Sequence, residues 1–498
     1  MTALVALVVA APLLASALAL GFRTRSRVRD AITLGGLSAT TALSAWLLVE
    51  VERNGPIAVR VGGWDPELGI VLVADLFAAL ILTVATATIL VVELFAIGQR
   101  RTVWGADPKL VGPLLLVLTA GVSLAILTGD LFTLFVAFEL ILISSYVLLT
   151  HQGRRGQIRS GMTYVSMNLF ASTLFLIGVA LVYAATGTVN FALLAERIPE
   201  LSTGVRTGIG LWFLVVFGTK AAIFPLFSWL PDSYPTAPTT ITAVFAGLLT
   251  KIGVYALIRF HVLTGMDDLG PVILTVAAVT MIVGVFGALA QDDVKRILSF
   301  HIVSQIGYML MGLGLFTVAG VAGAVLFLIH QIPIKTVLFL VGGLIEESEG
   351  TSALDKIGGL AARRPAIAAL FALSALSLAG LPPFSGFVAK LALVDAGIAE
   401  VATPIVVVSL VASVFTLLSM SKIWLGVFWG ESDGTDRVSE RSTAHASDRG
   451  HRLMMTATTV AVVGTLAIAL GSGQLWDLSE RAATDLVDPA VYIAEVLG

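Results

Sequence analysis

The sequence predicts an all-α polytopic membrane protein with about 14 transmembrane helices, including two inverted repeats that contain broken helices. Composition is the first reason: 57% of the 498 residues are hydrophobic, only 13% are charged, and the mean hydropathy is +0.96. A soluble chain would carry about 25% charged residues. The second reason is that apolar stretches of about 20 residues, long enough to span a bilayer, recur along the whole chain.

The predicted spans follow one another closely and leave no room for a soluble domain. The first apolar run resembles a signal peptide, but its arginines, from Arg23 to Arg29, follow the apolar region instead of preceding it. We therefore expect a first helix that is retained, with its N-terminus outside. The spans lie near residues 2–21, 31–51, 71–97, 110–128, 130–150, 161–185, 206–229, 240–262, 271–290, 298–316, 321–344, 366–393, 401–429 and 454–474.

Basic residues are unevenly distributed between alternate connections. If the N-terminus is outside, the odd-numbered connections are cytoplasmic, and these hold most of the Lys and Arg residues. The longest polar connection, Glu431 to Arg452, is predicted to be a flexible charged loop on the cytoplasmic side. We expect a multi-pass protein of a prokaryotic plasma membrane, with both termini outside.

An internal repeat is visible in the lysines. Lys220 and Lys251 are separated by nearly the same number of residues as Lys390 and Lys422. Each pair begins near a proline-broken apolar segment, GTKAAIFPLFSWLP in one case and LAGLPPFSGFVAK in the other. Interrupted helices at corresponding positions of two halves indicate an inverted-repeat transporter. Chance spacing is the alternative, because lysines are few.

Five charged side chains interrupt segments that are otherwise fit to span a bilayer. Each costs about 2.5–3.5 kcal/mol at the centre of a membrane helix, so such residues are rare and usually functional. Their number suggests a path for a charged species, most plausibly protons. The five are Glu139, Lys220, Lys251, Lys335 and Lys390, with His330 close to Lys335 in LFLIHQIPIKTVLFL.

Prolines inside three of the lysine-bearing segments should break helices and leave carbonyls unpaired. Such carbonyls must face protein or water, which would create a polar interior at mid-membrane. Simple packing kinks are the alternative. Pro225 would free the carbonyl of Ala221, Pro333 that of Ile329, and Pro382 with Pro383 those of Leu378 and Ala379.

Glu139 and Lys220 are expected to face each other as a switch. A carboxyl group that is buried and unpaired is neutral, whereas one facing a lysine is ionised, so movement of Glu139 would push the Lys220 proton onward. A static ion pair between two helices is the alternative. His330 is suited to passing protons, but a lone His in an apolar helix is as often a packing residue.

Three further charges have less certain roles. Lys422 lies near the predicted cytoplasmic end of its span beside Trp424, so we expect it to snorkel toward the interface. Asp75 and Asp130 lie near outer span ends, where they could be helix caps or acids at a proton entrance.

Several classes of site are excluded by what the sequence lacks. The absence of cysteine excludes disulfides, thiol catalysis and Cys-ligated clusters in this chain. No Walker A loop is present, the GxG runs fall in apolar helices or tight turns, and no His and carboxylate cluster has metal-site spacing. We expect no cofactor, no metal and no nucleic-acid partner.

Long stretches resemble a known family. They are DLFTLFVAFELILISSYVLLT, GTKAAIFPLFSWLPDSYPTAPTTITAVFAGLLTKIGVYALIR, QDDVKRILSFHIVSQIGYMLMGLGLF, HQIPIKTVLFLVGG and LAGLPPFSGFVAKL. They resemble the antiporter-like subunits shared by respiratory complex I, membrane-bound hydrogenases and Mrp-type multisubunit sodium/proton antiporters. Within that family the chain looks most like the D-type subunits of Mrp antiporters, judging by its length and the third and fourth stretches.

The resemblance implies five-helix repeats and a polar axis in the membrane plane. The chain would divide into residues 1–109 with helices 1–3, 110–265 with the first repeat, 266–429 with the second, and 430–498 with the cytoplasmic loop, helix 14 and an outer tail. Glu139, Lys220, Lys251 and Lys390 match the family's glutamate and lysines, and His330 with Lys335 matches its eleventh-helix pair. Lys390 is unlike the complex I member that has glutamate there, and the long lateral helix of the largest member is absent.

The implied function is proton translocation within a heteromeric cation/proton antiporter, with sodium as the expected cation and other membrane subunits and the lipid bilayer as partners. Such a chain is a secondary transporter subunit, not an enzyme. Two alternatives stay open: a proton-pumping subunit of a redox-driven complex, which would be part of a translocase, and a scaffold whose charges are structural.

Overall fold

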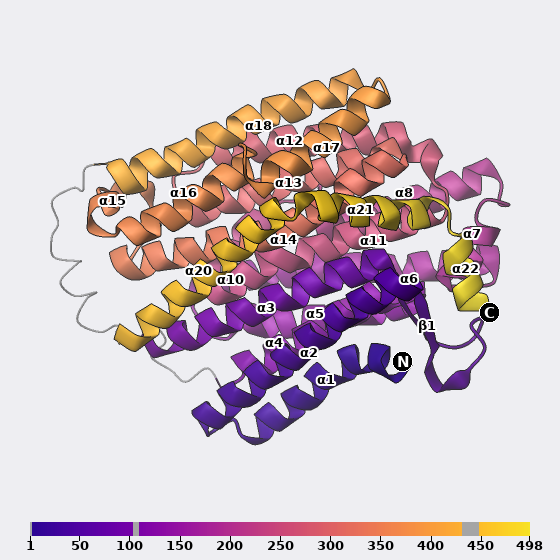
Figure 1. Cartoon of the computed structure of the whole chain (residues 1–498), viewed down its shortest axis with the longest axis horizontal. Helices are drawn as coiled ribbons and strands as arrows, with labels where there is room; N and C mark the ends of the chain where they lie inside the picture. The colour runs from indigo at the N-terminus through magenta and orange to yellow at the C-terminus, as the bar shows by residue number, and fades with distance from the viewer. Residues whose placement is uncertain (1, 103–108, 431–447) are drawn as a thin grey trace.

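The computed structural model describes residues 2–102, 109–430 and 448–498, and it shows a bundle of helices that run roughly side by side (Figure 1). Within these residues, eleven helices are long and apolar enough to cross a membrane, and Val111–Leu127 and Pro365–Ala379 are shorter apolar helices. The polytopic all-α fold predicted from the sequence is therefore confirmed. The predicted loop 431–452 lies outside the described residues as far as 447, and the prediction is wrong for residues 448–452, which are helical.

Helices lie within each of the fourteen predicted ranges, and how many of them cross the membrane stays a prediction. The N-terminal helices are α1 (Thr2–Gly21), α2 (Ser26–Asn54) and α3 (Leu76–Thr102). The first predicted repeat contains α4 (Val111–Leu127), α5 (Leu131–Thr150), α6 (Arg155–Thr186), α7 (Phe191–Arg197), α8 (Thr203–Ala221), α9 (Trp229–Ser233), α10 (Thr239–Val244) and α11 (Thr250–Leu263).

The second predicted repeat and the C-terminal part complete the bundle. They contain α12 (Gly270–Leu289), α13 (Val294–Leu315), α14 (Val318–Glu349), α15 (Leu360–Arg363), α16 (Pro365–Ala379), α17 (Ser385–Ala399), α18 (Thr403–Ile423), α20 (Asp448–Leu470), α21 (Ser472–Val487) and α22 (Ala490–Leu497).

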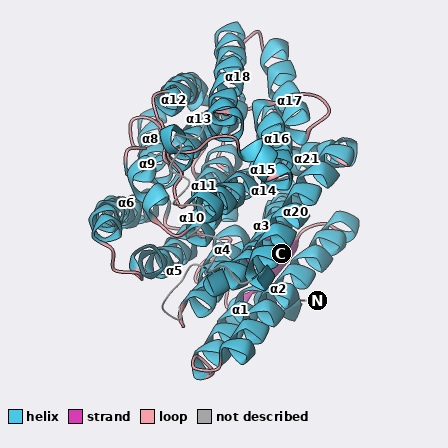
Figure 2. Cartoon of the chain, turned by 90° about the vertical axis from the view of Figure 1, so that its left-hand side faces the viewer, coloured by secondary structure: helices cyan, strands magenta, loops and turns pink. Residues whose placement is uncertain are grey.

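Four helices form the centre of the bundle. The segment Thr239–Leu263, which contains α10 and α11, is buried along its whole length, and α13 and α14 are almost completely buried. Seen from the side of the molecule that Figure 2 faces, α11 and α14 lie inside a ring of other helices. Peripheral helices, such as α1, α2 and α20, have no more than a third of the residues in their most apolar stretch buried. Side chains on the central helices are therefore shielded from lipid.

Three of the predicted ranges that carry a buried lysine differ from a single straight helix. In the range 206–229, α8 ends at Ala221 and a short non-helical segment precedes α9. In the range 366–393, α16 ends at Ala379 and α17 begins at Ser385. In the range 240–262, one segment, Phe245–Leu249, is π-helical. A break or a π-helical turn leaves carbonyls without their usual helical partner, so these irregularities supply acceptors inside the bundle.

A β-hairpin lies where a membrane helix was expected to begin. Strand β1 (Ile57–Arg60) pairs antiparallel with β2 (Val71–Ala74), with Ile57 opposite Ala74 and Arg60 opposite Val71. The predicted span 71–97 is therefore wrong at its start, because residues 71–74 are strand. Alternating valines favour the strand here, and the hairpin satisfies their backbone groups.

The C-terminal tail adds two helices, although the sequence predicted only an outer tail. Helix α21 packs along α14 and also contacts α3, and it buries Ser479, Ala482, Ala483 and Leu486. Helix α22 contacts α7 and β1, and Arg60 donates hydrogen bonds to the carbonyls of Val496 and Leu497 (Figure 1). The tail therefore closes one end of the bundle.

Asp75 and Asp130 both lie at helix N-termini. Asp75 accepts a hydrogen bond of 2.8 Å from the backbone N–H of Ala78 and forms a buried ion pair with Arg259. Asp130 accepts a hydrogen bond of 2.6 Å from the N–H of Thr133. Carboxylates at these positions satisfy orphan N–H groups and complement the helix dipole. The sequence left open whether these aspartates are helix caps or acids at a proton entrance, and the geometry supports the role of helix cap.

Candidate functional site: a row of buried lysines

The predicted site residues lie on five helices, of which α11 and α14 belong to the buried centre of the bundle. Lys220 lies near the end of α8, Lys251 is in α11, Lys335 and His330 are in α14, Lys390 is in α17, and Glu139 is in α5. The four lysines are between 0% and 7% exposed, and His330 is 1% exposed. A buried ammonium group is costly unless polar groups surround it, so the surroundings of each lysine decide what it can do.

Lys220 lies in the last turn of α8, beside the carbonyls that the helix end leaves unpaired. Its Nζ donates hydrogen bonds to Ser172 Oγ at 3.0 Å and to the carbonyl of Asn168 at 3.3 Å, both on α6. The negative end of a helix dipole favours a cation, so the break after Ala221 itself helps to hold the charge.

Glu139 is half-buried and does not touch Lys220. Its charge acts electrostatically on Lys220, but no ion pair within 4 Å joins them, and Glu139 Oε1 has no hydrogen-bond partner within the described part of the chain. The expected direct pair is therefore absent from this conformation, because α6 gives Lys220 nearer acceptors. A static ion pair between the two helices is absent for the same reason.

Lys251 is held by the irregular turn that precedes it. Its Nζ donates to the carbonyl of Ala246, inside the π-helical segment Phe245–Leu249. Two residues further on, Gly253 packs against the end of α8: a Cβ there would lie 2.6 Å from the backbone N of Ala221. Glycine at this position lets α11 approach the helix end that carries Lys220.

Lys335 and His330 lie on either side of Pro333 in α14. Lys335 Nζ has no hydrogen-bond partner among the residues described, and the charges of Lys251 and Lys390 both act on it. His330 Nδ1 lies 2.8 Å from Ser385 Oγ at the start of α17, whereas its Nε2 has no hydrogen-bond partner among the described residues. The pair therefore connects the centre of the bundle with the broken helix of the second half.

Lys390 reaches back across the break between α16 and α17. Its Nζ donates a 2.9 Å hydrogen bond to the carbonyl of Ala379 and lies 5.0 Å from the centre of the Tyr308 ring. Ala379 is one of the carbonyls that Pro382 and Pro383 were expected to free. Both breaks thus place a lysine at a helix C-terminus. Lys220 belongs to the helix that ends there, α8, whereas Lys390 comes from α17 and reaches the end of the preceding helix, α16.

Of the other two proline predictions, the one for Pro333 needs correction. Pro333 does not break its helix, because α14 runs from Val318 to Glu349 with Pro333 inside it. Helix α8 ends at Ala221, and the next residue, Ala222, adopts a left-handed conformation with φ 62° while its N–H donates to the carbonyls of Gly218 and Thr219. Pro225 lies four residues after the end of the helix. The chain terminates this helix before the proline, so Pro225 occupies the non-helical segment.

Lys422 does not join the row. Its Nζ donates to the carbonyls of Leu289 and Gln291 and lies 2.8 Å from a carboxylate oxygen of Asp292, in the connection between α12 and α13. Its side chain is 33% exposed. Lys422 therefore ties α18 to the end of α12, although it belongs to the sequence repeat.

Several polar residues around the row were not singled out from the sequence. His301 lies on α13 in contact with Ser419, and its Nδ1 has no partner among the described residues; the charges of Lys335 and Lys390 act on it. Gln305 accepts a 3.1 Å hydrogen bond from Gln331. His301, Gln305 and Tyr308 are spaced as one face of a helix, and this spacing in an apolar span could have revealed them.

The electrostatic interactions among the charged residues divide the row into two groups. Glu139 acts on Lys220 at one end, while Lys251, Lys335 and Lys390 interact through Lys335 at the other, with His330 and His301 beside them. The groups meet where Gly253 packs against Ala221. Like charges repel strongly in a low dielectric, so protonation of one lysine favours proton release from its neighbour. Within the described ranges, no three side chains of the metal-binding kinds converge on one point.

A substitution at Gly386, in the first turn of α17, tests whether the break between α16 and α17 must keep its shape. A Cβ at this position would overlap the carbonyl of Ser377 and lie 3.0 Å from His330 Nε2. We expect Gly386→Ala to lower the transport rate of the assembled complex by about tenfold, because small displacements of a reacting group are costly. Gly464→Ala is the matched control, since nothing lies within 4 Å of its added Cβ. Equal rates in the two variants would contradict the requirement.

The fold and the row together define a polytopic membrane protein with an ionisable core. Residues 128–416 match the family model described as NADH:quinone oxidoreductase/Mrp antiporter, TM. The chain is 42% identical to the D-type subunit of the Na(+)/H(+) antiporter of Alkalihalophilus pseudofirmus over 91% of both chains, and 37% identical to that of Bacillus subtilis over 98% of this chain and 97% of the relative. The chain belongs to the NADH:quinone oxidoreductase/Mrp antiporter family of membrane subunits.

Solved structures agree with this assignment. The Mrp complex from Dietzia sp. DQ12-45-1b contains a chain that superposes with a TM-score of 0.91, 36% identity and full coverage of both chains. A chain of the archaeal membrane-bound sulfane sulfur reductase matches with a TM-score of 0.88, 27% identity and 99% coverage of both. The resemblance to the D-type subunits of Mrp antiporters that the sequence motifs indicated is confirmed.

Proposed function

We propose that this chain is the proton-translocating subunit of a multisubunit sodium/proton antiporter. The observation that carries the proposal is the buried row: four lysines, each shielded from lipid, with a carboxylate at one end. The names of the relatives at 42% and 37% identity support sodium/proton exchange, and the Mrp complex supports other membrane subunits as partners.

In the proposed mechanism, protons pass from Glu139 through Lys220 and Lys251 to Lys335, His330 and Lys390. Movement of Glu139 toward Lys220 would stabilise the charged lysine, and its withdrawal would favour transfer to the second group. In that group, repulsion between Lys251, Lys335 and Lys390 disfavours full protonation, so each arriving proton displaces another. Carbonyls at the helix irregularities hold Lys251 and Lys390 without neutralising them.

The proposed setting is a prokaryotic plasma membrane, with both termini outside and the loop between α18 and α20 in the cytoplasm. The residue ranges 110–265 and 266–429 are proposed as the two repeats, preceded by residues 1–109 and followed by 430–498. Sodium would cross through a companion subunit, and the chain would act as a secondary transporter subunit and not as an enzyme.

Everted membrane vesicles test the proposal. With the whole complex present, addition of sodium to vesicles with an acidic interior should raise the interior pH, because sodium entry is exchanged for protons. Vesicles that contain every other subunit but lack this chain should show no such change. Lithium and potassium, tested in parallel, define the cation. Undiminished exchange without the chain would refute the proposal.

A further inference from the structure

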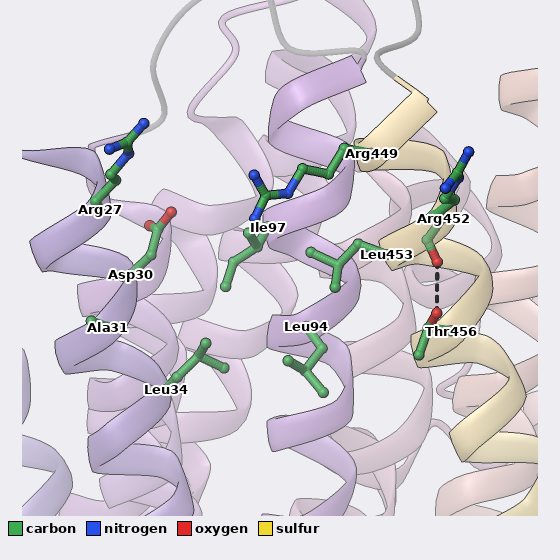
Figure 3. Close-up of a pocket in the computed structure, with 10 residues that line it drawn as sticks. All are labelled: Arg27, Asp30, Ala31, Leu34, Leu94, Ile97, Arg449, Arg452, Leu453 and Thr456. Atoms are coloured by element: carbon green, nitrogen blue, oxygen red, sulfur yellow. Dashed lines mark hydrogen bonds between the residues drawn. The ribbon is translucent and has the colours of Figure 1, made fainter.

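A groove away from the lysine row has the chemistry of a lipid site. It has a volume of about 500 Å³ and lies between α2, α3 and α20 at the end of the bundle where the chain enters α2 and α20 (Figure 3). Arginines and Asp30 lie toward its mouth, and Leu34, Leu94 and Leu453 are among the residues deeper between the helices. We propose that this groove binds an anionic phospholipid, with its phosphate at the arginines and its acyl chains along the leucines.

Among the residues whose side chains the structure describes, the acidic neighbours of the mouth do not compensate its positive charge. Asp30 forms ion pairs with Arg29 at 3.2 Å and with Arg100 at 2.9 Å, so its carboxylate is already engaged. Arg27 and Arg449 are exposed, and their guanidinium groups have no ion-pair or hydrogen-bond partner among the residues that the structure describes. Two guanidinium groups that border one groove match the negative charge of a phosphate group.

The apolar side chains deep in the groove distinguish a lipid from a free anion. Leu34 on α2 lies about two helical turns below Arg27, and Leu94 on α3 lies about two turns before the end of its helix (Figure 3). A free phosphate or a soluble anion would gain nothing from this apolar surface, whereas acyl chains would bury it. Helices α2 and α20 are peripheral, with fewer than a third of the residues in their most apolar stretch buried, so a lipid can reach the groove from the bilayer.

The position fits the membrane leaflet. The groove lies at the end of the bundle that the distribution of basic residues predicts to be cytoplasmic, and anionic lipids are concentrated in the cytoplasmic leaflet. Basic pockets between transmembrane helices on that side commonly bind anionic headgroups. The site is separate from the proposed proton path, so the inference goes beyond the proposed function and does not depend on it.

Binding of phosphatidylglycerol to the assembled complex tests the inference. We expect phosphatidylglycerol to bind the complex in neutral detergent and to raise its thermal midpoint, whereas zwitterionic phosphatidylcholine should not. The double variant Arg27→Gln with Arg449→Gln should weaken this binding by about tenfold, as native mass spectrometry would measure. The matched control is Arg159→Gln with Arg364→Gln, which removes two exposed arginines elsewhere on the predicted cytoplasmic side and should leave binding unchanged.

Three results would overturn the inference. Equal loss of binding in the control variant would show a general effect of surface charge. Inorganic phosphate that binds the groove as tightly as phosphatidylglycerol, and is unaffected by Leu34→Asn, would show a simple anion site. Loss of a companion subunit from the Arg27 and Arg449 variant, with lipid binding unchanged, would show that the groove is a subunit interface.

Discussion

Replacing Lys220 with alanine is expected to lower sodium-driven proton movement by about 100-fold or more, while the complex still assembles. A positioned proton donor and acceptor contributes about 10²–10⁴-fold to a proton-transfer rate, and Lys220 is the lysine on which the charge of Glu139 acts. Everted vesicles and a sodium pulse provide the measurement, and co-purification of the other subunits shows assembly.

A second substitution at this position separates proton transfer from a structural cation. Lys220→Arg keeps a positive charge that can reach Ser172, but arginine cannot be deprotonated in a protein, so transport should be lost here as well. Lys356→Ala is the control, because Lys356 is an exposed lysine in the connection before α15. Full transport with arginine at position 220 would show that Lys220 is only a fixed charge.

Replacing Glu139 with glutamine is expected to reduce exchange to a similar extent. Glutamine has nearly the same shape but cannot be ionised, so the charge that acts on Lys220 would be removed without a change in packing. Glu139→Asp keeps the charge on a shorter side chain and should retain partial transport, measured as the initial rate after the sodium pulse.

The aspartate variant distinguishes a switch from a helix contact. Because Glu139 already lacks a direct partner at Oε1 within the described residues, a purely structural role predicts little change in any of these variants. Glu200→Gln, at an exposed glutamate between α7 and α8, is the control. Normal exchange in Glu139→Gln would remove this residue from the proposed path, and so would equal activity of the glutamine and aspartate variants.

Much of the fold could be predicted because a bilayer imposes strong constraints on sequence. Apolar runs of about 20 residues and the asymmetric distribution of arginines are direct consequences of spanning a membrane. The breaks near Pro225 and Pro382 were predictable for the same reason that proline disrupts a helix. The burial of Lys220, Lys251, Lys335 and Lys390 followed from their place in apolar segments.

The remaining features depend on contacts that no local pattern encodes. The valines at 71–74 suit both a strand and the start of a membrane helix, and only pairing with residues 57–60 decides between them. The π-helical turn before Lys251 and the continuity of α14 through Pro333 depend on packing against neighbouring helices. Ser172 is the partner of Lys220 only because α6 packs beside α8, a contact between segments that are distant in the sequence.

The acceptors for Lys251 and Lys390 have a consequence for mutational scanning and for divergence. Both are main-chain carbonyls, of Ala246 and Ala379, and every residue type supplies an identical one. Side-chain replacement at these two positions therefore leaves the acceptor in place. An alanine scan would detect the lysine of each hydrogen bond but not the residue that accepts it. The feature that must be retained is the shape of the backbone. Related chains can therefore differ in sequence at Ala246 and Ala379 and still accept the hydrogen bonds of the two lysines.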